Sequence, residues 1–189
     1  WPAALGSARD VCEDPGDSDL DTGGWPMGVE TIEDFALVAY REEGRWQVGM
    51  LPERLMDDLD ALIAVLRQQP ADSGAIGLVN VADEFFVAVR VFAGDLRLLV
   101  SDVTAAVADD LARQVVERLG LPIPDEDDMD DVWPAGDLSI FSELGLEEME
   151  LGAILADIDA YPDEMLLAIA DRLGFGEPYE RALEGAILS

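Results

Sequence analysis

The fold of this chain is decided by the stretch AIGLVNVADEFFVAVRVFAGDLRLLV, which covers residues 75–100. It contains three apolar runs, at 75–81, 85–92 and 96–100, and their many Val, Leu, Ile and Phe residues are typical of β-strands. The runs are separated by Ala82-Asp83-Glu84 and by Ala93-Gly94-Asp95. Because connections this short join neighbouring antiparallel strands, the stretch predicts three strands joined by tight turns.

A hairpin and a helix are expected before this stretch. Residues 35–40 and 46–51 are apolar runs on either side of a polar turn that contains Gly44, which predicts a β-hairpin. Pro52 can then open a helix at its first turn, and the helix is expected to end near Pro70. Its inward face carries leucines at helical spacing: Leu55, Leu59, Leu62 and Leu66.

A second helix is expected after the stretch. Ser101 and Asp102 are good N-cap residues, the helix runs to about Leu119, and Gly120 is a typical C-terminal stop. The order ββαβββα predicts an α+β domain, a five-stranded antiparallel sheet with both helices on one face. This element order resembles that of roadblock, longin and profilin-like folds, and the resemblance implies a docking or dimerisation platform.

The chain divides by composition into four segments. Residues 1–31 are rich in Gly, Pro, Asp and Ser and predict a disordered acidic arm, whereas residues 32–120 form the predicted sheet domain and hold 8 of the 11 arginines. Residues 121–137 carry 7 acids and no base and predict an acidic linker. Residues 138–189 predict a helical C-terminal subdomain.

The segment 138–189 shows helical periodicity. Three short helices are expected, with these inward-facing residues: Leu151, Ile154, Leu155 and Ile158; Leu166, Ile169 and Leu173; and Tyr179, Leu183, Ala186 and Ile187. Pro162 suits the first turn of the second helix, and Gly174 suits its C-terminal cap. The pattern allows two arrangements, a small separate subdomain or a layer packed back on the sheet.

The composition excludes most catalytic chemistry. The chain has 42 acidic residues, 11 arginines, no lysine, no histidine and one cysteine, Cys12, for a formal charge of −31. Without histidine or lysine there is no Ser-His or Cys-His nucleophile and no Schiff base, and one cysteine cannot hold a structural zinc ion. We therefore predict a protein that is not an enzyme and has no cofactor. A pair of catalytic carboxylates stays open, but nothing among 42 acids selects one.

The charge also bears on partners and location. So acidic a chain is repelled by nucleic acid and by anionic membrane surfaces, and it attracts a basic protein. No apolar run approaches the roughly 18–20 residues that a membrane helix needs. The lone cysteine suits a reducing cytoplasm, and residues 1–10 show no secretory signal, so a cytoplasmic location is expected.

Two places in the chain stand out as candidate binding residues. One is the acidic run before Trp133, namely Asp125, Glu126, Asp127, Asp128, Asp130 and Asp131. It lacks the mid-loop glycine and the spacing of a calcium loop, so we interpret it as a solvated linker or a contact for a basic partner. Trp133 is either a docking anchor or folds back on the domain. Arg90 and Arg97 form a cross-strand salt bridge with acids or grip an anion.

Several stretches resemble one family. Residues 33–46 (EDFALVAYREEGRW) and 98–102 (LLVSD), with Ala105-Ala106, are similar to the actinobacterial tRNA adenosine deaminase-associated proteins. So are 134–138 (PAGDL), 161–166 (YPDEML) and 172–176 (RLGFG), and the resemblance covers about residues 32–188. Tyr161, Asp163 and Glu164 lie in the second of these tail stretches and complete our set of candidate partner-binding residues.

The resemblance implies association with the deaminase that converts wobble adenosine to inosine in tRNA. The chain lacks the His-x-Glu and Pro-Cys-x-x-Cys zinc signature of deaminases, so it is not the deaminase itself. The working hypothesis is a non-enzymatic accessory protein with a basic protein partner, the deaminase being the candidate. The alternatives are an acidic immunity, antitoxin or nucleic-acid-mimic protein that neutralises a basic enzyme, and a homodimeric scaffold that uses the open sheet edge.

Overall fold

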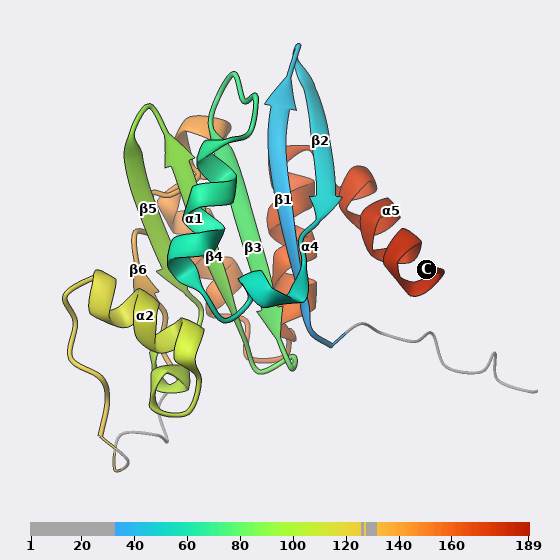
Figure 1. Cartoon of the computed structure of the whole chain (residues 1–189). Coiled ribbons are helices and arrows are strands. Elements are labelled where there is room, and N and C mark those ends of the chain that lie inside the picture. The colour runs from blue at the N-terminus through green and yellow to red at the C-terminus, as the bar shows by residue number, and fades with distance from the viewer. Residues whose placement is uncertain (1–32, 126, 128–131) are drawn as a thin grey trace, which may run out of the picture. The chain divides into compact units, whose positions relative to one another are not determined.

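The computed structural model describes residues 33–125, 127 and 132–189, which belong to one compact unit. The predicted arm at 1–31 lies outside the described residues. At the centre is an antiparallel sheet in the strand order β2-β1-β3-β4-β5-β6 (Figure 1). The strands are β1 (Phe35–Glu42), β2 (Arg45–Met50), β3 (Ala75–Val81), β4 (Phe85–Phe92), β5 (Asp95–Val100) and β6 (Ala135–Gly136). The hairpin and the three following strands are confirmed.

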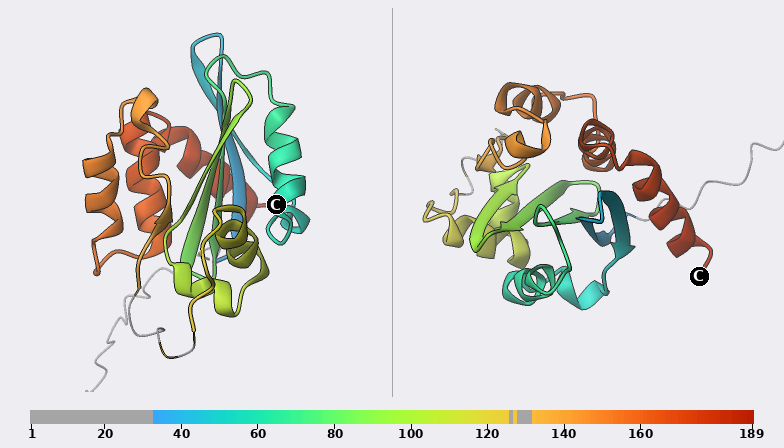
Figure 2. Two further views of the ribbon diagram at one scale, coloured as in Figure 1. Left: turned by 90° about the vertical axis from the view of Figure 1, so that its left-hand side faces the viewer. Right: turned by 90° about the horizontal axis from the view of Figure 1, so that it is seen from above.

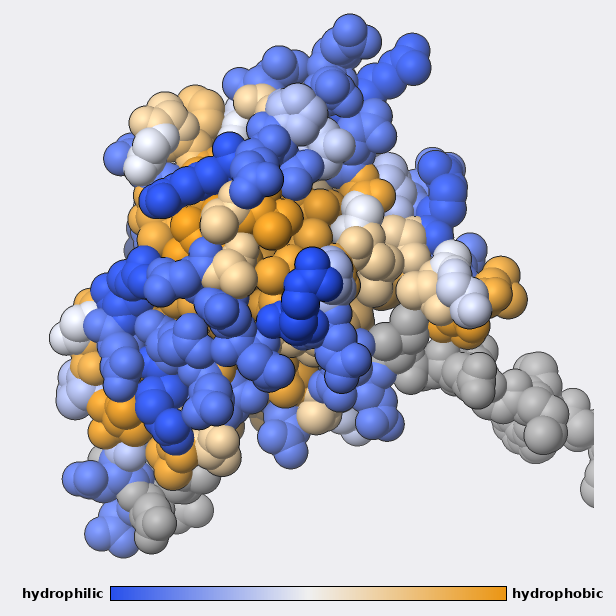
Figure 3. All heavy atoms as spheres, in the orientation of Figure 1, coloured by the Kyte–Doolittle hydropathy of each residue, from blue (hydrophilic) through white to orange (hydrophobic). Residues whose placement is uncertain are grey.

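The first two helices cover one face of the sheet. They are α1 (Leu59–Arg67) and α2 (Asp110–Arg118), and their apolar stripes meet residues such as Val38, Val79 and Val89 in a core on this face. Hydrophilic residues surround the apolar area in the space-filling view of this side (Figure 3). Of the described helices, none combines the length and apolar character needed to cross a bilayer.

Both helices begin later than expected. Residues from Pro52 and from Asp102 first form short 3₁₀ turns, η1 (Glu53–Leu55) and η2 (Val103–Val107). The α-helices start where an aspartate caps them, because Asp58 accepts a hydrogen bond from the backbone of Ala61 and Asp109 accepts one from that of Ala112. A capping aspartate inside each predicted helix therefore divides it into two parts.

The tail packs on the opposite face of the sheet. Its helices are α3 (Glu148–Leu155), α4 (Pro162–Leu173) and α5 (Gly176–Ile187). Leu151, Leu166, Ile169 and Leu173 bury their side chains against this face in a second core with Leu37, Leu78 and other strand residues. The sheet is thus covered on both sides (Figure 2). Of the two arrangements open from sequence, the structure has the one in which the tail is a layer of the sheet.

The prediction of a five-stranded sheet with two helices was wrong in its counts, because the sheet of the described residues has six strands, and the three tail helices cover it together with α1 and α2, which makes five α-helices. The additional strand is β6, a two-residue pairing in which Gly136 lies opposite Leu99. Gly136 has a φ of 125°, and a Cβ there would overlap the carbonyl oxygen of Leu98. Only glycine allows the two backbones to approach this closely. In addition, a strand of two residues is too short to be recognised from an apolar pattern in the sequence.

The turn between β3 and β4 places an acidic group at the end of the sheet. Ala82 and Asp83 have φ values of 49° and 51°, a conformation that residues other than glycine rarely adopt. The backbone N–H of Ala82 donates to Asp34, at 2.6 Å, and the side-chain amide of Asn80 donates to Asp83, at 2.9 Å. These two bonds fix the turn and set the position of the Asp83 carboxylate.

Candidate functional site

A cavity of about 530 Å³ opens at the end of the sheet that carries the β3–β4 turn. Its walls come from that turn, the residues after β5, the segment before β6, the end of α3 and the start of α4. They include Asp83, Glu84, Ser101, Asp102, Val132, Pro134, Leu155, Asp157, Ile158, Tyr161, Pro162 and Met165. We call this cavity the acid-rimmed pocket.

The acid-rimmed pocket combines apolar walls with negative charge. Ile158, Val132 and Tyr161 are large apolar or aromatic residues that remain exposed, Ile158 to 96%. Asp83, Glu84, Asp102 and Asp157 supply carboxylates, and none of the described residues that line the pocket is basic. A cluster of exposed apolar groups beside unbalanced carboxylates suits a partner surface that is both apolar and basic.

Ile158 corrects a sequence-based expectation. It was predicted to face inward with Leu151 and Leu155, but α3 ends at Leu155 and the chain turns at Asp157, whose carboxylate accepts a hydrogen bond from the backbone of Asp159. The helical periodicity therefore does not reach Ile158. Ile158 is therefore exposed at the pocket instead of being buried in the core.

The three candidate residues of the tail have different positions. Tyr161 lines the pocket, and its backbone N–H donates to the carboxylate of Glu164, at 2.9 Å, so Glu164 stabilises the start of α4. Asp163 is half-buried, and its carboxylate accepts a bond from the backbone of Glu164. Burial and the nearby charge of Asp83 raise the pKa of Asp163 above its usual value.

The acidic run is described only in part. Asp125 and Asp127 are exposed, and Glu126, Asp128, Asp130 and Asp131 lie outside the described residues. Trp133, 39% exposed, stands between two pocket residues, Val132 and Pro134, and its carbonyl accepts a hydrogen bond from Val103. Within the described part of the chain, no three acidic or cysteine side chains gather as a metal site would require. The binding role of this run stays a prediction.

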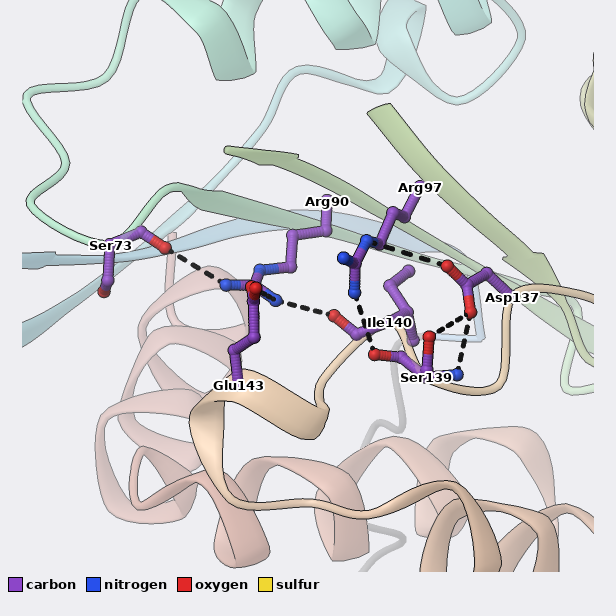
Figure 4. Close-up of polar contacts among 7 residues, drawn as sticks. All are labelled: Ser73, Arg90, Arg97, Asp137, Ser139, Ile140 and Glu143. Carbon is purple, nitrogen blue, oxygen red and sulfur yellow. Dashed lines mark hydrogen bonds and ion pairs between the residues drawn. The ribbon is translucent and has the colours of Figure 1, made fainter. Parts of the chain in front are cut away.

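The side chains of Arg90 and Arg97 bind the segment that precedes the tail helices. They do not form the salt bridge that was expected between neighbouring strands. They lie opposite each other on β4 and β5 and point toward the segment 137–143 (Figure 4). Arg90 is buried, donates to the carbonyl of Ile140 at 2.9 Å and pairs with Glu143 at 3.1 Å. Arg97 donates to the carbonyl of Ser139 and pairs with Asp137. The two arginines thus attach the start of the tail to the sheet.

The fold and the pocket define a three-layer α+β protein with an acid-rimmed apolar pocket. The chain belongs to the Rv3753c-like tRNA adenosine deaminase-associated protein family, whose family model matches residues 34–176. It is 38% identical over 158 residues to Protein Rv3753c of Mycobacterium tuberculosis, an actinobacterium, across 82% of this chain and 91% of that protein. No solved structure matches the chain. The family recognised from the sequence motifs is confirmed.

Proposed function

We propose that this chain is a non-enzymatic accessory protein that binds a tRNA adenosine deaminase and adjusts its access to tRNA in the cytoplasm. The family is named for association with such a deaminase, which supports a partner rather than a reaction. The absence of histidine and lysine from the sequence agrees with a role outside catalysis. A deaminase that binds tRNA presents a basic surface, which is the charge that this chain attracts.

The observation that carries the proposal is the acid-rimmed pocket. Its exposed Ile158 and Tyr161 offer apolar contact area, and its carboxylates offer charge complementarity at the same place. In such interfaces a few aromatic or aliphatic anchors supply most of the affinity, and the surrounding charges speed association and set specificity. An acidic chain bound at the tRNA-binding groove of the deaminase would compete with tRNA for the same basic residues.

Co-purification with the deaminase tests the proposal. We expect the unchanged chain to retain the deaminase at low salt and to release it at high salt. Ile158→Asp should weaken the complex, because it places a charge among the pocket's apolar groups. Met149→Asp is the matched control, since Met149 is also highly exposed on the tail but does not line the pocket. Equal losses in both variants, or no complex at low salt, would contradict the proposal.

The two alternatives from the sequence predict other outcomes. An inhibitor of a basic enzyme would abolish the activity of its target at a one-to-one ratio whatever the substrate concentration, whereas an accessory protein that competes with tRNA lowers the activity of the deaminase only until excess tRNA displaces it. A homodimeric scaffold would use β2, which is an edge strand of the described sheet. Light scattering at several concentrations decides between a monomer and that dimer.

A further inference from the structure

A second pocket lies next to the β3–β4 turn, at the same end of the sheet as the acid-rimmed pocket. It has a volume of about 430 Å³ and is formed by the start of β1, the end of β2 and the η1 turn, which packs beside β1 (Figure 1). Its walls include Glu33, Asp34, Met50, Leu51, Glu53 and Met56. We call it the methionine pocket, because two of the six methionines of the chain line it.

Hydrogen bonds connect the two pockets. Asp34, which lines the methionine pocket, accepts from the backbone N–H of Ala82 at 2.6 Å. Ala82 belongs to the β3–β4 turn, and its neighbour Asp83 lines the acid-rimmed pocket. The carbonyl of Glu33 also accepts from the side chain of Asn80 at 2.8 Å. The start of β1 is therefore fixed against the turn, and the two pockets keep one spacing.

The two pockets open on different faces of the sheet. Leu51 and Met56 pack with the core beneath α1 and α2, whereas Leu155 and Met165, which line the acid-rimmed pocket, pack with the core beneath the tail. The end of the sheet lies between them. A partner that fills both pockets therefore reaches around this end and contacts the β3–β4 turn on the way.

The methionine pocket repeats the chemistry of the acid-rimmed pocket. Glu33, Asp34 and Glu53 supply carboxylates beside its apolar groups, and none of the described residues that line it is basic. No three acidic side chains in the described ranges gather as a metal ion requires, so these carboxylates lie spread along a surface. Such a surface complements several basic side chains of one macromolecule.

The charge of the chain selects among the possible occupants of the methionine pocket. Residues 1–31, which precede it in the sequence, carry 7 acids and 1 arginine, and a second copy of the chain carries the same formal charge of −31. Like charges repel, so both of these occupants are disfavoured, as are nucleic acid and anionic lipid. The pocket favours a protein surface that presents apolar groups beside basic ones.

We propose that the methionine pocket is a second anchor site for the basic partner, and that the partner fills both pockets at once from the two faces of the sheet. Two contacts on one rigid body bind more tightly than either alone, because the second contact forms within the complex. This inference deepens the proposed function and rests on it for the identity of the partner as the deaminase.

Methionine methyl groups report on each pocket separately by NMR. In the chain labelled with ¹³C at these methyls, Met165 marks the acid-rimmed pocket and Met50 and Met56 mark the methionine pocket. Met149 is exposed on α3, lines neither pocket and serves as the control. During titration with purified deaminase, we expect the signals of all three pocket residues to change together and to saturate at one ratio. The signal of Met149 should stay unchanged.

The free chain tests the other occupants. Met50 signals that move with the concentration of the chain alone would show that a second copy fills the methionine pocket. A nuclear Overhauser contact between the methyl groups of Met27 and Met50 would show that the chain's own N-terminal segment fills it. Either result would overturn the second anchor site.

Charge reversal tests whether the methionine pocket contributes to affinity. Glu53→Gln should weaken deaminase binding about two- to fivefold, the range for an exposed ion pair, and Glu53→Arg should weaken it further. Glu117→Arg is the matched control and should bind almost as well as the unchanged chain. Glu117 is also exposed but lies on α2 and lines neither pocket, and neither glutamate takes part in an ion pair between described residues. Equal losses in Glu53→Arg and Glu117→Arg would overturn the inference.

The outcomes separate this inference from the proposed function. A complex that shifts Met165, is weakened by Ile158→Asp and is indifferent to Glu53→Arg would overturn the second anchor site and leave the accessory role intact. No complex at low salt would contradict the deaminase as the partner and would overturn the second anchor site with it.

Discussion

Arg90 is a charged residue in the interior that links two layers of the molecule. Its guanidinium leaves the sheet at β4 and contacts Ser73, Ile140 and Glu143, which lie on segments far apart in the sequence (Figure 4). Burial lowers the pKa of Arg90, and the charge of Glu143 opposes that effect. The residue stays charged, and its partners at the start of the tail are held in place by it.

Replacing Arg90 by methionine should therefore destabilise the fold. We expect Arg90→Met to lower the free energy of unfolding by about 2–3 kcal/mol, because the Ile140 carbonyl loses a charged donor. Arg97→Met, at a more exposed position, should cost about 1 kcal/mol or less. Urea unfolding of both variants measures the difference. Equal and small losses would show that Arg90 does not hold the tail to the sheet.

The pH dependence of stability contains a contribution from Asp163. The pKa of its carboxyl is raised in the folded protein, so the folded state binds this proton more tightly than the unfolded state does. The contribution of this carboxyl group to stability is fully present below its ordinary pKa, near 3.8, and is lost as the pH rises through its pKa in the folded protein. Asp163→Asn should thus be more stable than the unchanged chain at pH 7, and this difference in stability should become smaller in acid. Thermal unfolding from pH 4 to pH 7 checks this, and a gap that widens in acid would contradict it.

At the scale of elements, the short strand β6 sets the position of the pocket wall formed by Val132 and Pro134. The N–H of Asp137 donates to the carbonyl of Leu98, and the N–H of Val103 donates to that of Trp133. Only glycine fits at position 136, between these two bonds. Gly136 therefore allows the segment before the tail to pair with β5 at the edge of the sheet.

Gly136→Ala should break the pairing of β6 with β5. The added methyl group meets the backbone of Leu98 and Leu99, so hydrogen exchange at the amides of Asp137 and Val103 should become faster. Gly145→Ala is the control, because Gly145 also has a positive φ, of 102°, but has open space around its Cα. If both variants leave the two amides equally protected, β6 does not anchor this segment.

How closely a strand or helix could be predicted from the sequence depends on how many residues carry its apolar pattern. β3 and β4 are buried on both faces, and this is why their apolar runs are continuous and their bounds were predicted closely. The same continuity was the signal that a second layer covers the sheet. In contrast, the division of the helices at Asp58 and Asp109 and the pairing of Gly136 depend on single side chains and on one close contact. The periodicity of apolar residues along the sequence does not show such features.

The candidate site was predictable only in part, for a related reason. Tyr161 was named from a motif and lines the pocket. Ile158 was expected to face inward, and Asp83 and Glu84 were named as a turn but not as part of a site. Periodicity shows neither where α3 ends nor which carboxylates a turn brings to the pocket.

At the scale of the whole molecule, the net charge of −31 should make stability depend on salt. The helical tail, 138–189, and the sheet segment, 32–120, are both net negative, and they pack against each other. Raising salt from about 0.01 M to about 0.15 M shortens the screening length from about 30 Å to about 8 Å. The melting temperature should therefore rise with sodium chloride. A melting temperature that falls would show that repulsion between carboxylates does not limit the stability of the fold.

A calorimetric titration of purified tRNA adenosine deaminase with this chain, at low and at high salt, is the sharpest test of the proposed complex. We expect a complex of defined stoichiometry whose affinity falls steeply with salt, is reduced by tRNA and is weaker for Ile158→Asp than for Met149→Asp. A titration without heat of binding at low salt, or a complex indifferent to salt and to Ile158, would contradict it.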